Sequence, residues 1–90
     1  MNTNTAPTET TVTLKILGPG CANCKRLEAN VRQAVEQLGV QAELEKVEDI
    51  TDIMAYGVMR TPALVVNEQV LFYGRVPSIP EIKALLSDSL

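Results

Sequence analysis

The chain has 90 residues and a net charge of −3, and 46% of its residues are hydrophobic although it contains no tryptophan and one phenylalanine. This length allows one small domain, whose core must be aliphatic. The acidic balance argues against nucleic acid and against an anionic membrane as partners, because both bind through basic patches.

The first eleven residues are rich in threonine and have neither a basic start nor an apolar stretch, so they do not form a secretory signal. We expect residues 1–11 to be a flexible tail and residues 12–90 to be a single domain. No apolar run approaches the roughly 18 residues of a transmembrane helix. A cytoplasmic location is the default expectation, and there a close cysteine pair is more often catalytic or metal-binding than structural.

The hydrophobic pattern predicts a buried strand over Val12–Leu17, a turn at Gly18-Pro19-Gly20 and a helix from about Ala22 to Leu38. Gly39 supplies the left-handed residue that ends this helix. One face of the helix is apolar, with members spaced as a single stripe: Cys24, Leu27, Val31, Ala34, Val35 and Leu38. That face is expected to pack on the core.

The segment Val40–Val47 alternates imperfectly between apolar and charged residues, which suits a strand near the edge of a sheet. Asp49 can cap a short helix that stops at Gly57. Three apolar side chains precede the next strand and could form a rim for a partner protein, namely Met54, Tyr56 and Met59. We expect at least two of them to pack in the core instead.

Thr61–Val66 and Gln69–Tyr73 predict an antiparallel hairpin, the first strand of which opens with a proline. The turn between them, Asn67-Glu68, lacks the favoured glycine, which leaves a longer loop open. Ser78-Ile79-Pro80-Glu81 is a capping box with proline in the first turn, and it predicts a last helix. The apolar side of that helix consists of Ile82, Leu85 and Leu86.

The predicted order is strand, helix, strand, helix, strand, strand, helix (βαβαββα). A right-handed crossover through the first helix makes the first two strands parallel, and the hairpin adds two antiparallel strands. The expected fold class is therefore α/β, with a mixed four-stranded sheet packed between helices.

The only two cysteines, Cys21 and Cys24, stand at the start of the first predicted helix. Unpaired amides and the helix dipole favour negative charge there. If Cys21 is the N-cap residue, its sulfur accepts a hydrogen bond from the Cys24 amide, and its pKa falls below the usual value of about 8.5. Cys24 belongs to the apolar stripe and lies underneath. The pattern indicates dithiol redox chemistry, with Cys21 as nucleophile and Cys24 as resolving cysteine.

Three other readings of the cysteine pair stay open. A structural disulfide is a poor fit, because closing a four-residue loop stabilises by only about 2 kcal/mol, against about 3 for fifteen residues. Thiolates at this spacing also bind copper(I) or zinc, although two cysteines without histidine cannot complete a tetrahedral zinc site in one monomer. The third reading is a redox-switched binding module, which docks a partner and catalyses no reaction. We expect no metal and no cofactor.

Three segments make the chain resemble thioredoxin-fold proteins, most closely the small, glutaredoxin-sized thioredoxins called redox-active disulfide proteins. They are Gly18-Pro19-Gly20-Cys21-Ala22-Asn23-Cys24-Lys25, Arg60-Thr61-Pro62 and Phe72-Tyr73-Gly74-Arg75-Val76-Pro77. The resemblance covers about Val12 to Leu86. It implies a thioredoxin-like fold, the cysteine roles given above, and a cis Thr61–Pro62 bond that faces the sulfurs.

The resemblance also implies how a substrate binds. Thr61 and Pro62 would offer backbone to an extended substrate segment by strand addition, and Gly20 and Ala22, which flank Cys21, would contact the same segment. Disulfide-containing proteins would be the substrates of a monomer recharged by a thioredoxin-reductase-type electron donor.

Two features of the chain depart from its larger relatives. Ala22-Asn23 replaces the familiar Gly-Pro or Pro-Tyr pair between the cysteines, which leaves the reduction potential open. Unlike the corresponding strand of larger thioredoxins, the first predicted strand contains no acidic residue, and Lys15 is its only charged residue. The group that takes the proton of Cys24 is therefore unassigned, with a water or Lys25 as candidates. Lys25 could also lower the pKa of the nucleophile through its positive charge.

Overall fold

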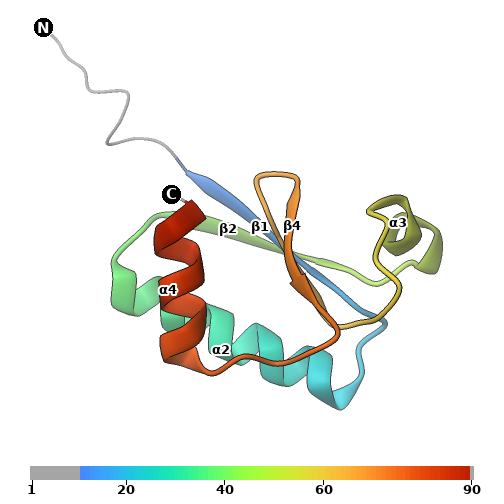
Figure 1. Cartoon of the computed structure of the whole chain (residues 1–90), viewed down its shortest axis with the longest axis horizontal. Coiled ribbons are helices and arrows are strands. Elements are labelled where there is room, and N and C mark those ends of the chain that lie inside the picture. The colour runs from blue at the N-terminus through green and yellow to red at the C-terminus, as the bar shows by residue number, and fades with distance from the viewer. Residues whose placement is uncertain (1–10, 90) are drawn as a thin grey trace, which may run out of the picture.

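The computed structural model describes residues 11–89, so the tail expected over residues 1–11 lies outside the described part except for Thr11. The described elements follow the predicted order βαβαββα (Figure 1). They are β1 (Val12–Leu17), α2 (Ala22–Leu38), β2 (Ala42–Val47), α3 (Ile50–Ala55), β3 (Ala63–Val66), β4 (Gln69–Tyr73) and α4 (Ile79–Ser89). β2 begins two residues later than the sequence predicted.

The four strands form one mixed sheet in the order β2-β1-β3-β4. β1 pairs in parallel with β2 and antiparallel with β3, and β3 and β4 form the predicted hairpin. β2 is an edge strand, as its charged residues indicated. Because β1 and β3 are antiparallel, Leu17 at the end of β1 lies opposite Ala63 at the start of β3. The loop after β1 and the segment before β3 therefore meet at one end of the sheet.

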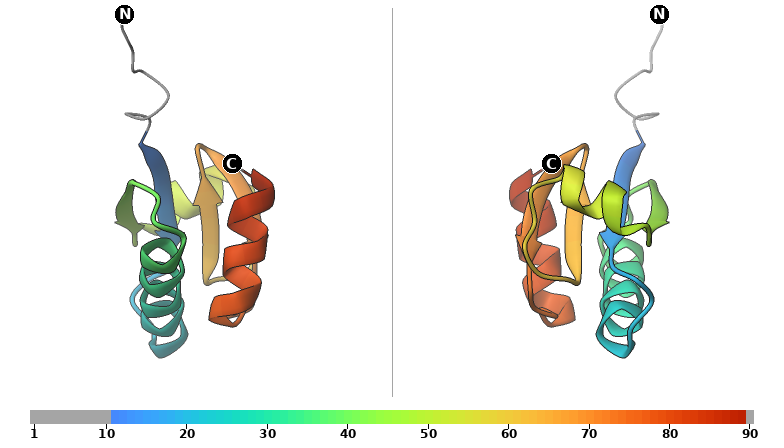
Figure 2. Two further views of the ribbon diagram at one scale, coloured as in Figure 1. Left: turned by 90° about the vertical axis from the view of Figure 1, so that its left-hand side faces the viewer. Right: turned by 90° about the vertical axis from the view of Figure 1, so that its right-hand side faces the viewer.

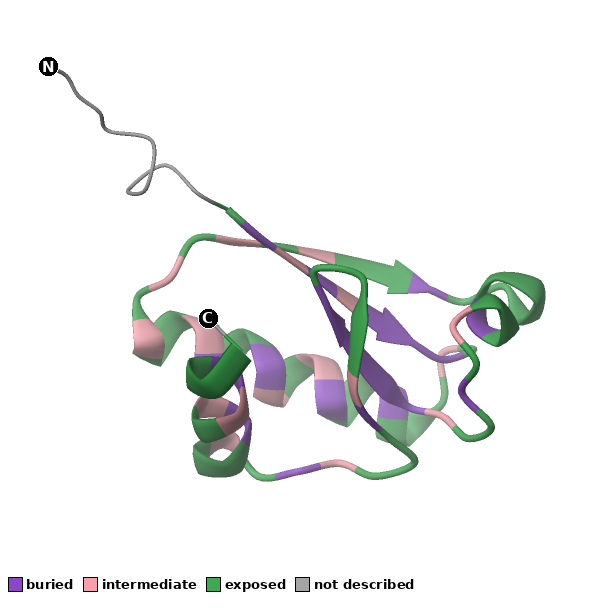
Figure 3. Ribbon diagram, turned by 45° about the horizontal axis from the view of Figure 1, so that its top comes forward, coloured by how far each residue is buried: buried purple, intermediate pink, exposed green. Residues whose placement is uncertain are grey.

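Helices cover both faces of the sheet, α2 and α4 on one and α3 on the other (Figure 2). The two central strands supply both cores, and Figure 3 shows buried stretches along them. Toward α2 and α4 the fully buried side chains include Leu14, Leu27, Val31, Leu64, Ile82 and Leu86. A smaller cluster lies under α3 and contains Leu17, Val47, Ile53, Val58, Ala63 and Val65. All four residues of β3 are buried, as expected for a strand covered on both faces.

The hairpin turn consists of two residues and is not a longer loop. Asn67 and Glu68 have φ angles of 49° and 70°, the positive values that a two-residue type I′ turn requires. Side-chain contacts offset the conformational cost of a non-glycine residue there. The Asn67 side chain accepts the Thr13 amide at 3.0 Å, while Glu68 accepts from Lys15 Nζ at 2.7 Å and from the Tyr56 hydroxyl at 2.9 Å.

Within residues 11–89, no helix combines the length and the apolarity that a membrane crossing requires.

Candidate functional site

Cys21 is the N-cap residue of α2, as the sequence predicted. Its backbone is extended, with φ −72° and ψ 171°, and its Sγ accepts a hydrogen bond from the Cys24 amide at 3.3 Å. The cap forms because the turn Gly18-Pro19-Gly20 leads the chain from the end of β1 into the first turn of the helix. Gly20 has a φ of 93°, which favours glycine at this position. The sulfur thus satisfies a helix amide that would otherwise lack a partner.

The two cysteines are free thiols in very different environments. Cys21 is exposed, whereas Cys24 is only 5% exposed on the buried face of α2. Their Sγ atoms are 2.6 Å apart and share a hydrogen bond. Cys24 packs so closely on Gly18 that a Cβ at that glycine would overlap its sulfur. One thiol is therefore accessible, and the second is held directly beneath it.

The pKa values of the two thiols are shifted in opposite directions. Hydrogen bonds lower the pKa of Cys21 below that of an ordinary thiol, first from the Cys24 side chain and then from the Cys24 amide. Burial raises the pKa of Cys24, and the hydrogen bond to Cys21 raises it further. The sequence predicted the amide contribution, but it did not predict that the Cys24 thiol is the stronger donor. Cys21 is accordingly the thiol that ionises first.

The segment before β3 lies beside the cysteine pair, as the strand register requires. The Thr61–Pro62 peptide bond is cis. A Cβ built on Gly18 would lie 3.8 Å from the Thr61 Cβ, so Thr61 borders the same glycine that Cys24 contacts. Pro62 is buried, and its carbonyl accepts the Gly74 amide at 2.8 Å.

The remaining predicted site residues surround the thiol pair. Ala22 is exposed beside Cys21, and Gly20 is half-buried. Lys25 is exposed and lies at the opening of a cavity behind the pair. Its charge is not among the causes that lower the pKa of Cys21, which are all hydrogen bonds within residues 21–24.

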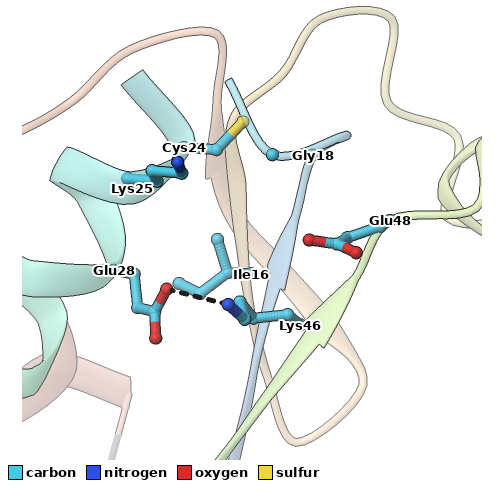
Figure 4. A pocket seen from close by; sticks show the side chains of 8 residues that line it. Ile16, Gly18, Cys24, Lys25, Glu28, Lys46 and Glu48 are labelled. Atoms are coloured by element: carbon cyan, nitrogen blue, oxygen red, sulfur yellow. Dashed lines mark ion pairs between the residues drawn. The ribbon is translucent and has the colours of Figure 1, made fainter. Parts of the chain in front are cut away.

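The cavity has a volume of about 30 Å³ (Figure 4). Of its charged lining residues, sequence reasoning named Lys25 and missed Glu28, Lys46 and Glu48. Its lining consists of Ile16, Gly18, Gly20, Cys24, Lys25, Glu28, Lys46 and Glu48. For Glu28 and Lys46 the sequence carried a signal. Glu28 follows Cys24 by one helical turn, and the parallel pairing of β1 with β2 places Lys46 beside Ile16.

The expectation for the three apolar residues before Thr61 was wrong. Met54 and Met59 are 67% and 88% exposed, and only Tyr56 is half-buried. α3 has six residues, of which only Ile53 is buried against the sheet. Val58 completes the cluster under α3, and neither methionine belongs to that cluster. Met59 instead lies in the exposed segment that leads to Thr61.

Glu28 makes an ion-pair network that should affect stability in a pH-dependent way. Its carboxylate accepts from Arg32 at 2.8 Å and faces Lys46 Nζ at 3.6 Å, and these contacts hold its pKa below the usual value of 4.5. A lowered folded-state pKa gives stability that is present above about pH 4.5 and is lost as the pH falls further. We expect Glu28→Gln to lower the free energy of unfolding by about 0.5–1 kcal/mol at pH 7.

Urea denaturation at pH 7 and pH 3 measures this effect, and the difference between Glu28→Gln and the unmodified protein should be smaller at pH 3 than at pH 7. Glu36→Gln is the matched control, because Glu36 lies on the same helix and forms no ion pair within residues 11–89. Equal losses at both pH values, or an equal loss in the control, would contradict the assignment.

The described part of the chain contains no group of three histidine, cysteine or carboxylate side chains that could hold a metal ion. The chemistry in place is that of two thiols, one exposed and one buried, next to a cis-proline. That arrangement, on a four-stranded mixed sheet with helices on both faces, defines a thiol redox protein of the thioredoxin-like class.

Comparison with known proteins agrees with this class. The family described as "Thioredoxin domain" matches residues 12–87. A thioredoxin from Methanothermobacter thermautotrophicus is 45% identical over 74 residues, which are 82% of this chain and 96% of that protein. A thioredoxin from Methanocaldococcus jannaschii is 39% identical over 79 residues, 88% of this chain and 91% of the relative. The chain therefore belongs to the thioredoxin family, and a disulfide oxidoreductase activity goes with that membership.

The fold itself is shared more widely. The germline-specific thioredoxin Deadhead of Drosophila melanogaster superposes with a TM-score of 0.63 at 13% identity, covering 93% of this chain and 86% of that one. At this identity the likeness supports the fold alone.

Proposed function

We propose that this protein reduces disulfide bonds in protein substrates through Cys21 and Cys24. The Cys21 thiolate attacks one sulfur of the substrate disulfide, so that a mixed disulfide forms and the other substrate sulfur leaves as a thiolate. Cys24 then loses its proton and attacks Cys21 Sγ. The intramolecular disulfide forms, the mixed disulfide breaks, and the second substrate sulfur leaves. The substrate gains two electrons, and the cysteine pair loses them.

The main support is the geometry of the two sulfurs. An exposed thiol with a lowered pKa can meet a substrate, while a buried thiol with a raised pKa stays protonated until the mixed disulfide forms. The separation of 2.6 Å means that resolution requires little movement. A purely structural pair would not need this division between an accessible and a buried sulfur.

Substrate binding is proposed for the surface beside Cys21. An extended substrate segment would pair with the backbone of Thr61 next to Pro62, by strand addition. Gly20 and Ala22 flank the nucleophile and would contact the same segment. The exposed Met59 side chain adds apolar area two residues before Thr61. Lys25 would add positive potential near the opening of the site.

Recharging requires an electron donor, and we propose a thioredoxin-reductase-type partner that acts on a monomer without a cofactor. The cytoplasm is the proposed location, because thiols are kept reduced there. An insulin-reduction assay supplied either with such a reductase or with glutathione distinguishes the two donor types. Soft-metal binding through the two thiolates is not favoured, because the family match and the relatives named thioredoxin support a redox protein.

The pKa of Cys21 provides a direct test. In Cys24→Ser, the serine hydroxyl can still donate to Cys21 Sγ, so we expect the rate of alkylation to titrate below about 8.5. In Cys24→Ala that donor is lost, and because the Cys24 side chain is the first cause of the lowered pKa, the midpoint should rise. Iodoacetamide labelling from pH 5 to 10 measures both. A midpoint near 8.5 in Cys24→Ser would remove the basis for an activated nucleophile.

A further inference from the structure

The resolving step needs a group that takes the proton of Cys24, and β1 does not supply one. Burial raises the pKa of Cys24, so its thiol holds a proton when the mixed disulfide forms. The only charged residue of β1 is Lys15, which pairs with Glu68 and Tyr56. The proton acceptor must therefore come from another element or from solvent.

The cavity behind the cysteine pair brings four charged side chains to the neighbourhood of Cys24 (Figure 4). Two of them, Lys25 and Glu28, belong to α2. Lys46 belongs to β2, and Glu48 is the first residue after β2. The two lysines are cations and cannot accept a proton. Only the two carboxylates are candidates.

The two carboxylates differ in what they already bind. Glu28 accepts from Arg32 at 2.8 Å and faces Lys46 at 3.6 Å, and these cations make it a weak base. Glu48 is exposed and makes no ion pair or side-chain hydrogen bond within residues 11–89. Its Oε2 lies 3.5 Å from the point where a Cβ on Gly20 would stand. Glu48 is thus the unengaged carboxylate beside the loop that holds Cys21.

We propose that Glu48 accepts the proton of Cys24 through one water molecule in this cavity. The volume of about 30 Å³ is enough for one water, and thiol, carboxylate and lysine groups around it offer that water partners. The inference rests on the proposed function. The water takes the Cys24 proton while it gives one of its own to the Glu48 carboxylate. The Cys24 thiolate then attacks Cys21 Sγ, and the substrate sulfur leaves.

The experiment separates the two thiol steps with the chromogenic disulfide 5,5′-dithiobis(2-nitrobenzoate). Attack by Cys21 releases one thionitrobenzoate, and resolution by Cys24 releases a second, so stopped-flow absorbance shows two phases. We expect Glu48→Gln to slow the second phase by at least about ten-fold at pH 7 and to leave the first phase within about two-fold. Glu48→Asp keeps a carboxylate and should recover part of the rate.

The direction of the effect is decisive. A charge acting only through space would give the opposite result, because loss of a nearby negative charge lowers the pKa of Cys24 and speeds resolution. Glu45→Gln is the matched control, since Glu45 lies three residues earlier and pairs in register with Lys15. The solvent deuterium isotope effect on the second phase should also shrink in Glu48→Gln alone.

Each outcome has one meaning. If the second phase is unchanged or faster in Glu48→Gln, the proposed role of Glu48 is wrong. The same holds if Glu28→Gln slows the second phase and Glu48→Gln does not. A slowing that Glu45→Gln shares equally overturns it too. Absence of the first phase in the unmodified protein would instead contradict the proposed function, because Cys21 would then not attack disulfides.

Discussion

Cys24→Ser is expected to remain covalently attached to its substrate. Cys21 keeps its place at the helix N-cap and still attacks, but no thiol is left 2.6 Å away to release it. Insulin-reduction turnover should fall by about three orders of magnitude or more. Non-reducing electrophoresis and mass spectrometry after incubation with insulin should show a covalent adduct of the protein with insulin, and dithiothreitol should release the insulin by reducing the mixed disulfide.

The Cys21→Ser variant is the matched control. It keeps the buried thiol, which is 5% exposed and has a raised pKa, so it should show neither turnover nor adduct. Equal adducts in the two variants would contradict the assignment of nucleophile and resolving cysteine. Tight but non-covalent substrate binding by Cys24→Ser would instead favour a redox-switched binding module.

Gly18→Ala is expected to damage both stability and catalysis. The new Cβ would overlap Cys24 Sγ and lie 3.8 Å from the Thr61 Cβ, so either the loop or the helix start must move. Overpacking of this kind typically destabilises by about 1–3 kcal/mol. A shift of Cys24 away from Cys21 should also slow insulin reduction by at least about ten-fold, since small misplacements of reacting groups have large effects on rate.

Gly57→Ala separates packing from backbone strain. Gly57 has a φ of 78°, but a Cβ there would meet nothing within 4 Å. This variant should lose about 1 kcal/mol for the left-handed backbone alone and keep its activity. Urea denaturation and insulin reduction on both variants provide the comparison. Unchanged activity in Gly18→Ala would mean that close contact with Gly18 does not position Cys24.

Local signals along the chain were enough to predict most of the fold. Helix ends and strands are encoded by neighbouring residues, so the cap at Cys21, the stop at Gly39 and the edge position of β2 were all predicted. The hairpin turn was less clear, because Asn67-Glu68 lacks glycine. Contacts of Glu68 with Lys15 and Tyr56, which are 53 and 12 residues away in sequence, make that turn possible. Such long-range compensation has no local signal.

Part of the candidate site could likewise be predicted from local signals, and part depends on contacts between distant residues. The cysteine spacing and the helix start indicated which thiol is exposed and which is buried. The charged lining of the cavity depends on the packing of α2 against β1 and β2, which places Glu28, Lys46 and Glu48 around Cys24. The exposure of Met54 and Met59 was also missed, because sequence gives their hydrophobicity but not the amount of sheet that a six-residue helix can cover.

The strand that follows Pro62 has a consequence for which disulfides can be reduced. β3 is buried along its whole length, between two paired strands and two helical layers, and such a segment opens only with global unfolding. The Thr61–Pro62 segment, for which substrate binding is proposed above, leads directly into this strand, and its Pro62 carbonyl accepts the Gly74 amide. We therefore expect this segment to be held in place before a substrate arrives. The substrate chain must therefore change its own conformation to bring its disulfide to Cys21, and the substrate chain bears the entropic cost of that ordering. Disulfides in loose or partly unfolded regions should consequently react much faster than those locked inside compact domains.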